Sequence, residues 1–187
     1  MNPSAFFFFL TADLEKISSR STPNQVLAIV RKKKDPQEIT VPPGVFLMLD
    51  GIQDPGNFGT IVRIADWFGI STILCSPECA DLYNPKVVQS TMGSLLRVNV
   101  IYTNLAAWCK TNAGAEVYAA TLHGKSIYQR SPLTHGAILM GNESKGVHPE
   151  LLHLCKEQIT IPRTGLAESL NAAVATGIIL SHLVKQV

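Results

Sequence analysis

Several sequence motifs of common enzyme classes are absent from this chain of 187 residues. No Gly-x-Gly-x-x-Gly follows a strand candidate, which argues against the usual dinucleotide-binding turn. A Walker-type phosphate loop and a His-Glu-x-x-His metal helix are also missing, and the five histidines are scattered. The four cysteines match no zinc spacing. We therefore expect no metal, and we interpret most of these cysteines as buried free thiols.

Long apolar runs and strong charge are lacking as well. The segment Phe6–Leu10 is too short to cross a membrane and lacks the flanks of a signal peptide, so we predict a buried strand there. Together with reduced thiols, this predicts a cytoplasmic protein with no membrane partner. Charged residues make up 16% and the net charge is +2, which neither demands nor excludes nucleic acid. The run Arg31–Lys34 fits a solvated loop and an RNA-facing patch equally well.

Hydrophobic residues, by contrast, make up 46% of the chain, enough for a substantial core and typical of one domain with a small appendage. We place the boundary at Pro42-Pro43-Gly44, which separates an amino-terminal segment, residues 1–42, from a main domain, residues 43–187. The first segment contains a helix candidate, Asp13–Ser19, and a strand candidate, Val26–Val30.

The main domain alternates short apolar runs with helical stretches, which predicts an α/β fold with a mostly parallel sheet flanked by helices. The predicted strands are Val45–Leu49, Ser71–Cys75, Arg97–Tyr102, Val117–Thr121, Ala137–Met140 and Gln158–Ile161. The predicted helices are Phe58–Phe68, Pro85–Thr91, Leu105–Thr111, Pro149–Leu154 and a final helix from about Glu168 to Lys185.

Three loops after predicted strands carry polar residues and glycines. The first leads into a helix in which Arg63 lies off the apolar face, so it is either a solvated arginine or a residue that projects into a cleft. The second contains Glu143 between Gly141 and Gly146, and this carboxylate is either a surface group or a partner for a cation such as Arg63. In the third, Ser169 and Asn171 are plausible helix caps with no ligand role. Ligands of α/β sheets bind at such carboxyl ends of strands.

The three loops together, in this order, resemble the SpoU/TrmH family of RNA ribose methyltransferases within the SPOUT superfamily. The similarity covers roughly residues 45–187. The matching motifs are Asn57-x-Gly59-x3-Arg63-x-Ala65, Gly141-x-Glu143-x2-Gly146 and Ile161-Pro162-x2-Gly165-x3-Ser169-Leu170-Asn171.

This resemblance implies a carboxyl-terminal trefoil knot, one of the rare exceptions to unknotted folds. It also implies S-adenosylmethionine as cofactor, a homodimer with sites near the subunit interface, and a structured rRNA or tRNA as partner, not DNA. The cofactor would be bound mostly by backbone groups of the knot loops. The implied cofactor-binding residues are Thr121, Leu122, His123, Gly141, Asn142, Gly146, Ile161 and Leu170.

The resemblance makes Arg63 the candidate catalytic residue. Because a guanidinium stays protonated, we hypothesise that it binds the neighbouring phosphate and stabilises the developing alkoxide instead of acting as a plain base. Asn57, Glu143, Ser169 and Asn171 would hold Arg63 and the ribose. Further phosphate contacts would come from the basic segment and from Arg97, Arg130 or Arg163.

The chain departs from the family pattern in two places. Arg163 stands where an apolar residue is usual, and Ala172-Ala173 replaces Val-Ser. Residues 1–42 are similar only to the tail of the family's amino-terminal RNA-binding domain, followed by a linker.

Two alternatives remain open from the sequence. One is a catalytically inactive knot protein that binds RNA or helps ribosome assembly, against which the retained polar residues of the three motifs count. The other is a different α/β enzyme that uses a nucleotide, against which the missing phosphate loops count.

Overall fold

The computed structural model describes residues 11–18, 22, 32 and 39–185. By its contacts the chain divides into two compact units, Met1–Asp35 and Pro36–Val187. In the first unit, the described residues form the helix α1 (Thr11–Ile17), which overlaps the helix predicted there. The predicted strands Phe6–Leu10 and Val26–Val30 lie outside the described residues, as does most of the basic run. The domain boundary after residue 42 stays a prediction.

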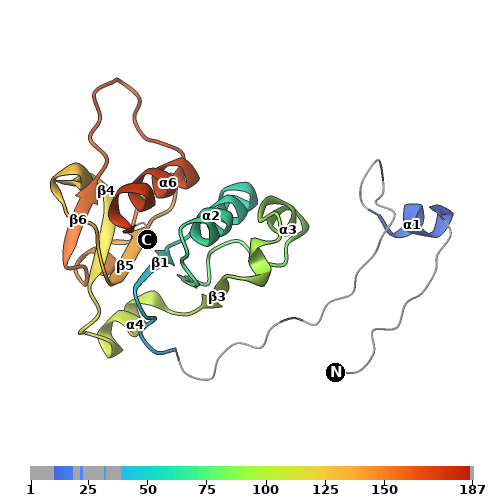
Figure 1. Ribbon diagram of the computed structural model, residues 1–187, viewed down its shortest axis with the longest axis horizontal. Coiled ribbons are helices and arrows are strands. Elements are labelled where there is room, and N and C mark those ends of the chain that lie inside the picture. Colours follow the sequence, from blue (N-terminus) through green and yellow to red (C-terminus); the bar gives the residue numbers. More distant parts are fainter. Residues whose placement is uncertain (1–10, 19–21, 23–31, 33–38, 186–187) are drawn as a thin grey trace. The chain divides into compact units, whose positions relative to one another are not determined.

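The second unit is built on a six-stranded sheet in which every pairing is parallel, so the predicted fold class is confirmed (Figure 1). The strand order is β3-β2-β1-β5-β4-β6, which puts β1 and β5 side by side near the centre. The strands are β1 (Val45–Leu49), β2 (Thr72–Cys75), β3 (Asn99–Tyr102), β4 (Val117–Ser126), β5 (Gly136–Met140) and β6 (Glu157–Thr160).

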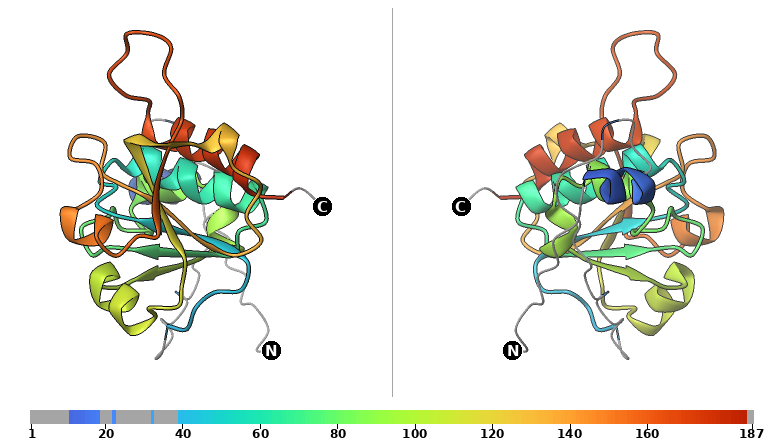
Figure 2. Two further views of the ribbon diagram at one scale, coloured as in Figure 1. Left: turned by 90° about the vertical axis from the view of Figure 1, so that its left-hand side faces the viewer. Right: turned by 90° about the vertical axis from the view of Figure 1, so that its right-hand side faces the viewer.

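Helices cover both faces of this sheet, as Figure 2 shows. Leu47 and Leu49 of β1 pack in the core beneath α2 and α6, whereas Phe46 and Met48 of the same strand pack beneath α4 and α5. Successive strand residues point to opposite faces, so a central strand covered on both sides is apolar throughout. The helices of this unit are α2 (Pro55–Trp67), α3 (Pro85–Ser90), α4 (Leu105–Thr111), α5 (Pro149–Leu152) and α6 (Ala172–Leu183).

Two element boundaries differ from the sequence-based expectations in ways that bear on function. The last helix begins at Ala172 and not near Glu168, because the Asn171 side chain accepts hydrogen bonds from the backbone amides of the first turn. β4 continues to Ser126, well past the predicted end at Thr121. Its pairing with β6 is interrupted between Ala120 and Lys125, where an irregularity shifts the register.

The cysteines agree with the sequence-based interpretation. Cys75, Cys79 and Cys109 are buried, and all four thiols are free. Burial also raises the pKa of the Cys155 thiol, to about 12. In the part of the chain that the structure describes, no helix is both long and apolar enough to cross a membrane.

Candidate active site

The loops that follow β1, β5 and β6 supply the residues that the sequence analysis singled out. Because these strands are parallel, their carboxyl ends lie at one edge of the sheet, where α/β proteins bind ligands. The loop after β1 leads into α2, whose first turn contains Asn57. The loop after β5 contains Glu143, and the loop after β6 ends at Asn171, directly before α6.

Three of the predicted residues meet in a hydrogen-bonded row. Asn57 Nδ2 donates to Glu143 Oε1 at 2.9 Å. Asn171 Nδ2 donates to Asn57 Oδ1 at 2.8 Å. One residue from each of the three loops is therefore held in a fixed relation to the other two.

The contacts of Asn171 with the first turn of α6 determine which atoms of the row donate and which accept. Asn171 Oδ1 accepts from the amides of Ala173 and Val174, at 2.9 and 3.2 Å, so its Nδ2 is left to donate. Asn57 must then present Oδ1 to Asn171 and Nδ2 to Glu143. The row thus runs in one direction and ends on the Glu143 carboxylate, whose second oxygen accepts no hydrogen bond from a described residue.

Arg63 and Ser169 are not part of this row. Arg63 is exposed, about 9 Å further along the α2 axis than Asn57 at the usual helical rise, and it makes no hydrogen bond or ion pair with the described residues. Glu143 therefore meets Asn57 and not Arg63, the cation that the sequence analysis considered for it. Ser169 is exposed in the loop after β6, which projects from the sheet edge in Figures 1 and 2.

The residues expected to bind the cofactor surround the same edge and suit an adenosine derivative. Thr121 Oγ1 is buried and has no hydrogen-bond partner in the structure, so it has an unused polar group to offer a ligand. Leu122 and Leu170 are 64% and 49% exposed, which leaves apolar surface that a purine ring would cover. His123 lies in the irregular part of β4, and Ile161 directly follows β6.

Gly141 shows how closely the backbone approaches itself at this edge. A Cβ atom there would lie 2.3 Å from the backbone carbon of Gly146, so no other residue fits without moving the loop. The loop closes on itself through two hydrogen bonds between the backbones of Asn142 and Gly146. These contacts fix the shape of the loop at this part of the edge.

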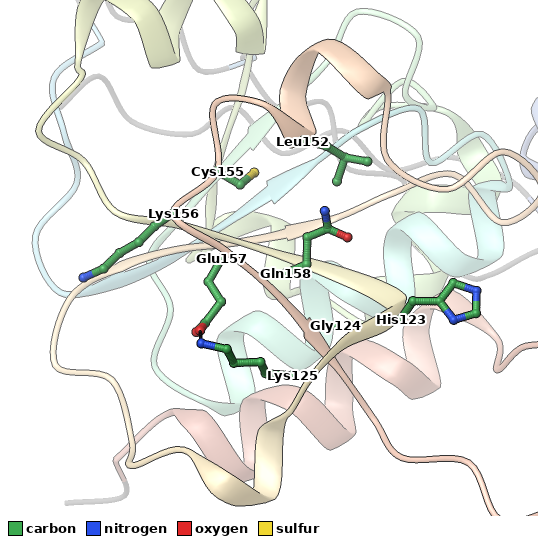
Figure 3. Close-up of a pocket in the computed structure, with 8 residues that line it drawn as sticks. All are labelled: His123, Gly124, Lys125, Leu152, Cys155, Lys156, Glu157 and Gln158. Atoms are coloured by element: carbon green, nitrogen blue, oxygen red, sulfur yellow. Dashed lines mark ion pairs between the residues drawn. The ribbon is translucent and has the colours of Figure 1, made fainter.

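A cavity of about 500 Å³ opens beside the irregular part of β4 (Figure 3). Residues of β4 face the turn between α5 and β6 across it, and Lys125 pairs with Glu157 at 2.6 Å along its rim. Of the residues predicted to bind the cofactor, His123 alone lines this cavity. Its lining residues are His123, Gly124, Lys125, Leu152, Cys155, Lys156, Glu157 and Gln158.

Two of the three arginines expected to contact RNA phosphates are engaged within the protein. Arg97 Nη2 lies 2.6 Å from Asp66 Oδ2, and its Nε also donates to that carboxylate. Arg130 pairs with Glu157 and stacks over the Tyr118 ring at 4.2 Å. Arg163 makes one bond, from Nη1 to the Ala167 carbonyl, and remains exposed. The expectation of phosphate contacts therefore fits Arg163 better than the other two.

Sequence reasoning missed the residues that tie the loops together. Ser76 is 5% exposed, and its Oγ accepts from the Gly51 amide at 3.0 Å. Asp50 Oδ2 accepts from the His148 amide at 2.7 Å. No local pattern marks either residue, because each partner is far away in the sequence. Within the described residues, no group of three His, Cys, Asp or Glu side chains is arranged to hold a metal ion.

Comparison with known proteins is consistent with this geometry. Residues 44–181 match the SpoU rRNA Methylase family. The chain is 34% identical over 170 residues to the 23S rRNA (guanosine(2553)-2'-O)-methyltransferase RlmP of Bacillus subtilis, a match that covers 89% of this chain and 67% of that protein. It spans between 63% and 67% of the length of three curated relatives.

Solved structures confirm the fold. An rRNA methyltransferase from Sinorhizobium meliloti superposes with a TM-score of 0.83 at 30% identity, over 93% of this chain and 69% of that one. The SpoU methyltransferase AviRb from Streptomyces viridochromogenes, solved in complex with the cofactor AdoMet, superposes with a TM-score of 0.78 at 28% identity, over 91% and 69%. These structural similarities are consistent with the predicted trefoil knot, which stays a prediction for this chain.

Proposed function

We propose that this chain, which belongs to the SpoU rRNA Methylase family, transfers a methyl group from S-adenosylmethionine to a ribose 2′-hydroxyl of rRNA or tRNA. The observation that carries the proposal is the row from Asn171 through Asn57 to Glu143, with Arg63 unpaired on the same helix as Asn57. The relatives named above as rRNA methyltransferases support the reaction class. The polar residues of this row are already arranged in the structure, which counts against an inactive RNA-binding protein.

The roles of the residues follow from their contacts. Arg63 is an exposed cation with no described partner, and we assign it to the phosphate beside the target ribose and to the developing alkoxide. Asn57, Glu143 and Asn171 form a pre-arranged row that orients the ribose. Ser169, which is exposed in the loop after β6, would also contact the ribose.

The residues in the irregular part of β4 and those that follow β5 and β6 fit S-adenosylmethionine, which when bound supplies an electrophilic methyl group. Thr121 Oγ1 would gain its missing partner from the cofactor. Leu122 and Leu170 would cover the adenine ring, and the tight loop that contains Gly141, Asn142 and Gly146 would form one wall of the site. His123 and Ile161 would complete the walls of the site.

We also propose that the chain acts as a homodimer in the cytoplasm. Leu166, Leu170 and Val174 are 99%, 49% and 52% exposed, and they flank Asn171 at the start of α6. An apolar surface beside polar site residues is typical of an interface near the active site. The RNA substrates and the free thiols support the location.

The first experiment is calorimetric titration with S-adenosylmethionine combined with transfer of its labelled methyl group to unmodified 23S rRNA and tRNA transcripts. We expect binding of one cofactor per chain and a product that resists alkaline cleavage at one nucleotide. Arg63→Ala should keep cofactor binding and lower single-turnover transfer by about 1,000-fold. Normal transfer by this variant would refute the role of Arg63. Cofactor binding without transfer to either RNA would favour the inactive RNA-binding protein.

Oligomeric state is tested separately with Val174→Asp. This change places a carboxylate on the exposed apolar surface at the start of α6, so light scattering should show a shift from dimer to monomer. Val41→Asp is the matched control, because Val41 is 45% exposed and lies before β1. A monomeric parent protein would contradict the proposed dimer.

A further inference from the structure

The backbone of Gly51 is held at its amide and at its carbonyl by side chains that follow two other strands. Its amide donates to Ser76 Oγ, which follows β2, at 3.0 Å. Its carbonyl accepts from Asn142 Nδ2, which follows β5, at 2.7 Å. Gly51 itself has a φ of +66°, a backbone conformation that side chains rarely adopt. The backbone of this one glycine thus joins three of the loops at the sheet edge.

The Asn142 side chain is occupied by this arrangement. Its Oδ1 accepts from the amides of Ser144 and Lys145, at 2.9 and 3.0 Å, and its Nδ2 donates to Gly51. The Asn142 backbone bonds in both directions with Gly146. A ligand therefore has little of Asn142 left to contact, although the family resemblance placed this residue among those that bind the cofactor.

The position of Glu143 follows from the position of Asn142. Glu143 is the next residue, and it must meet Asn57, which lies six residues after Gly51 in the loop and helix that follow β1. A second tie, from the His148 amide to Asp50 Oδ2 at 2.7 Å, joins the same two loops. The distance between Glu143 and Asn57 is thus set by contacts outside the row itself.

We propose that Ser76 and Asn142 are positioning residues that clamp Gly51 and thereby align the row from Asn171 through Asn57 to Glu143. The proposal rests on the methyltransferase function proposed above. Neither side chain touches the reacting atoms in this account. Their contribution is orientation, and a small displacement of a positioned group lowers the rate of a chemical step far more than the affinity for the ligand.

Asn142→Asp is the sharpest test. The carboxylate still accepts from the Ser144 and Lys145 amides, but it cannot donate to the Gly51 carbonyl. Asn104→Asp is the matched control, because Asn104 only accepts, from the Ala107 amide at 2.9 Å at the start of α4. Ser76→Ala removes the other side of the clamp and provides the test if Asn142→Asp does not fold.

The effect of the clamp on the stability of the loops is tested without RNA or cofactor, by measuring hydrogen exchange at the backbone amides of Gly51 and His148. We expect exchange at both amides to accelerate by about tenfold or more in Asn142→Asp and to be unchanged in Asn104→Asp. Unchanged exchange in Asn142→Asp would overturn the clamp. This result does not depend on the proposed function, so a failure of that function would be recognised separately, by absence of transfer in the parent protein.

The positioning role is measured as a split between affinity and rate. We expect Asn142→Asp to bind S-adenosylmethionine as the parent does and to transfer methyl groups to the 23S rRNA transcript about tenfold to 100-fold more slowly in single turnover. A matching loss of cofactor affinity would make Asn142 a cofactor ligand and overturn the proposal. An unchanged rate with accelerated exchange would also overturn it, since the clamp would then have no effect on the chemistry.

Discussion

The two ends of α2 carry polar networks that look alike and differ in what they leave unsatisfied. At the carboxyl end, Asp66 accepts from Ser94 Oγ at 2.7 Å and from two nitrogens of Arg97. At the amino end, Asn57 links Asn171 to Glu143. Each network joins α2 to segments far away in the sequence.

The difference lies in the charges. The carboxylate of Asp66 faces a guanidinium, and this pairing lowers its pKa. At the amino end, the Glu143 carboxylate accepts a hydrogen bond from the neutral side-chain amide of Asn57. Arg63, the cation of α2, has no partner among the described residues. A network that neutralises its own charges stabilises the fold, whereas one that ends on a carboxylate with no ion-pair partner keeps a charge that can act on a ligand. The first should therefore affect stability, and the second activity.

Among changes within the row, the largest expected effect comes from Asn57→Asp, which removes the donor at its centre. The carboxylate still accepts from Asn171 but faces Glu143 with no proton to donate, so we expect single-turnover methyl transfer to fall by about 100-fold at neutral pH. Two adjacent carboxylates raise the pKa of one of them, and its protonated form donates as the amide did. The rate should thus recover in part as the pH falls.

Asn84→Asp serves as the control for this change. Asn84 also begins a helix, and its side chain only accepts, from the Lys86 amide at 2.9 Å. We expect its transfer rate to match that of the parent. A rate for Asn57→Asp that shows no change with pH would argue against a proton shared with Glu143.

A smaller effect is expected from Glu143→Gln, which separates the charge of the row from its geometry. The glutamine oxygen can still accept from Asn57 Nδ2, so the row persists while its negative charge is lost. Because bonds to charged groups are stronger by about 1.4 kcal/mol, we expect transfer to fall by about tenfold. Single-turnover rates with the same transcript measure this. If Glu143→Gln lowered the transfer rate as much as Asn57→Asp does, the negative charge of Glu143, and not the geometry of the row, would account for the contribution of the row to the rate.

The strands and the three loops could be predicted from the sequence because their signals are local. Val45–Leu49 is apolar throughout, as a strand buried on both faces must be, and the polar residues follow directly after each strand. The start of the last helix could not be predicted in this way. Ser169 and Asn171 are both plausible caps in the sequence, and only the contacts of Asn171 with the amides of the first turn show that the helix begins at Ala172.

The contacts within the site depend on tertiary structure, and the sequence analysis could not supply them. Asn57 and Glu143 lie on different loops, and their meeting depends on β1 and β5 being neighbours in the sheet. The same applies to Ser76, whose Oγ looks like that of any other serine until the Gly51 amide is seen beside it. The sequence also suggested Arg63 as a partner for Glu143. The structure shows that the first turn of α2, which contains Asn57, meets Glu143 instead.

The smallest expected effect is on stability and tests the other end of α2. Asp66→Asn removes the ion pair with Arg97, a partly exposed pair, so we expect a loss of about 1 kcal/mol in the free energy of unfolding at neutral pH. Because pairing lowers the pKa of Asp66 below its ordinary 3.8, the stabilisation is present above that value and is lost as the pH falls through the lowered pKa.

Urea midpoints of parent and variant should therefore differ at neutral pH and converge in acid. Glu150→Gln is the control, since the pair of Glu150 with Lys110 is more than half exposed on both sides and should contribute less. Methyl transfer by Asp66→Asn should equal that of the parent. If the transfer rate of Asp66→Asn fell as far as that of Glu143→Gln, the network at the carboxyl end of α2 would affect activity as well as stability. The two networks would then not have separate roles.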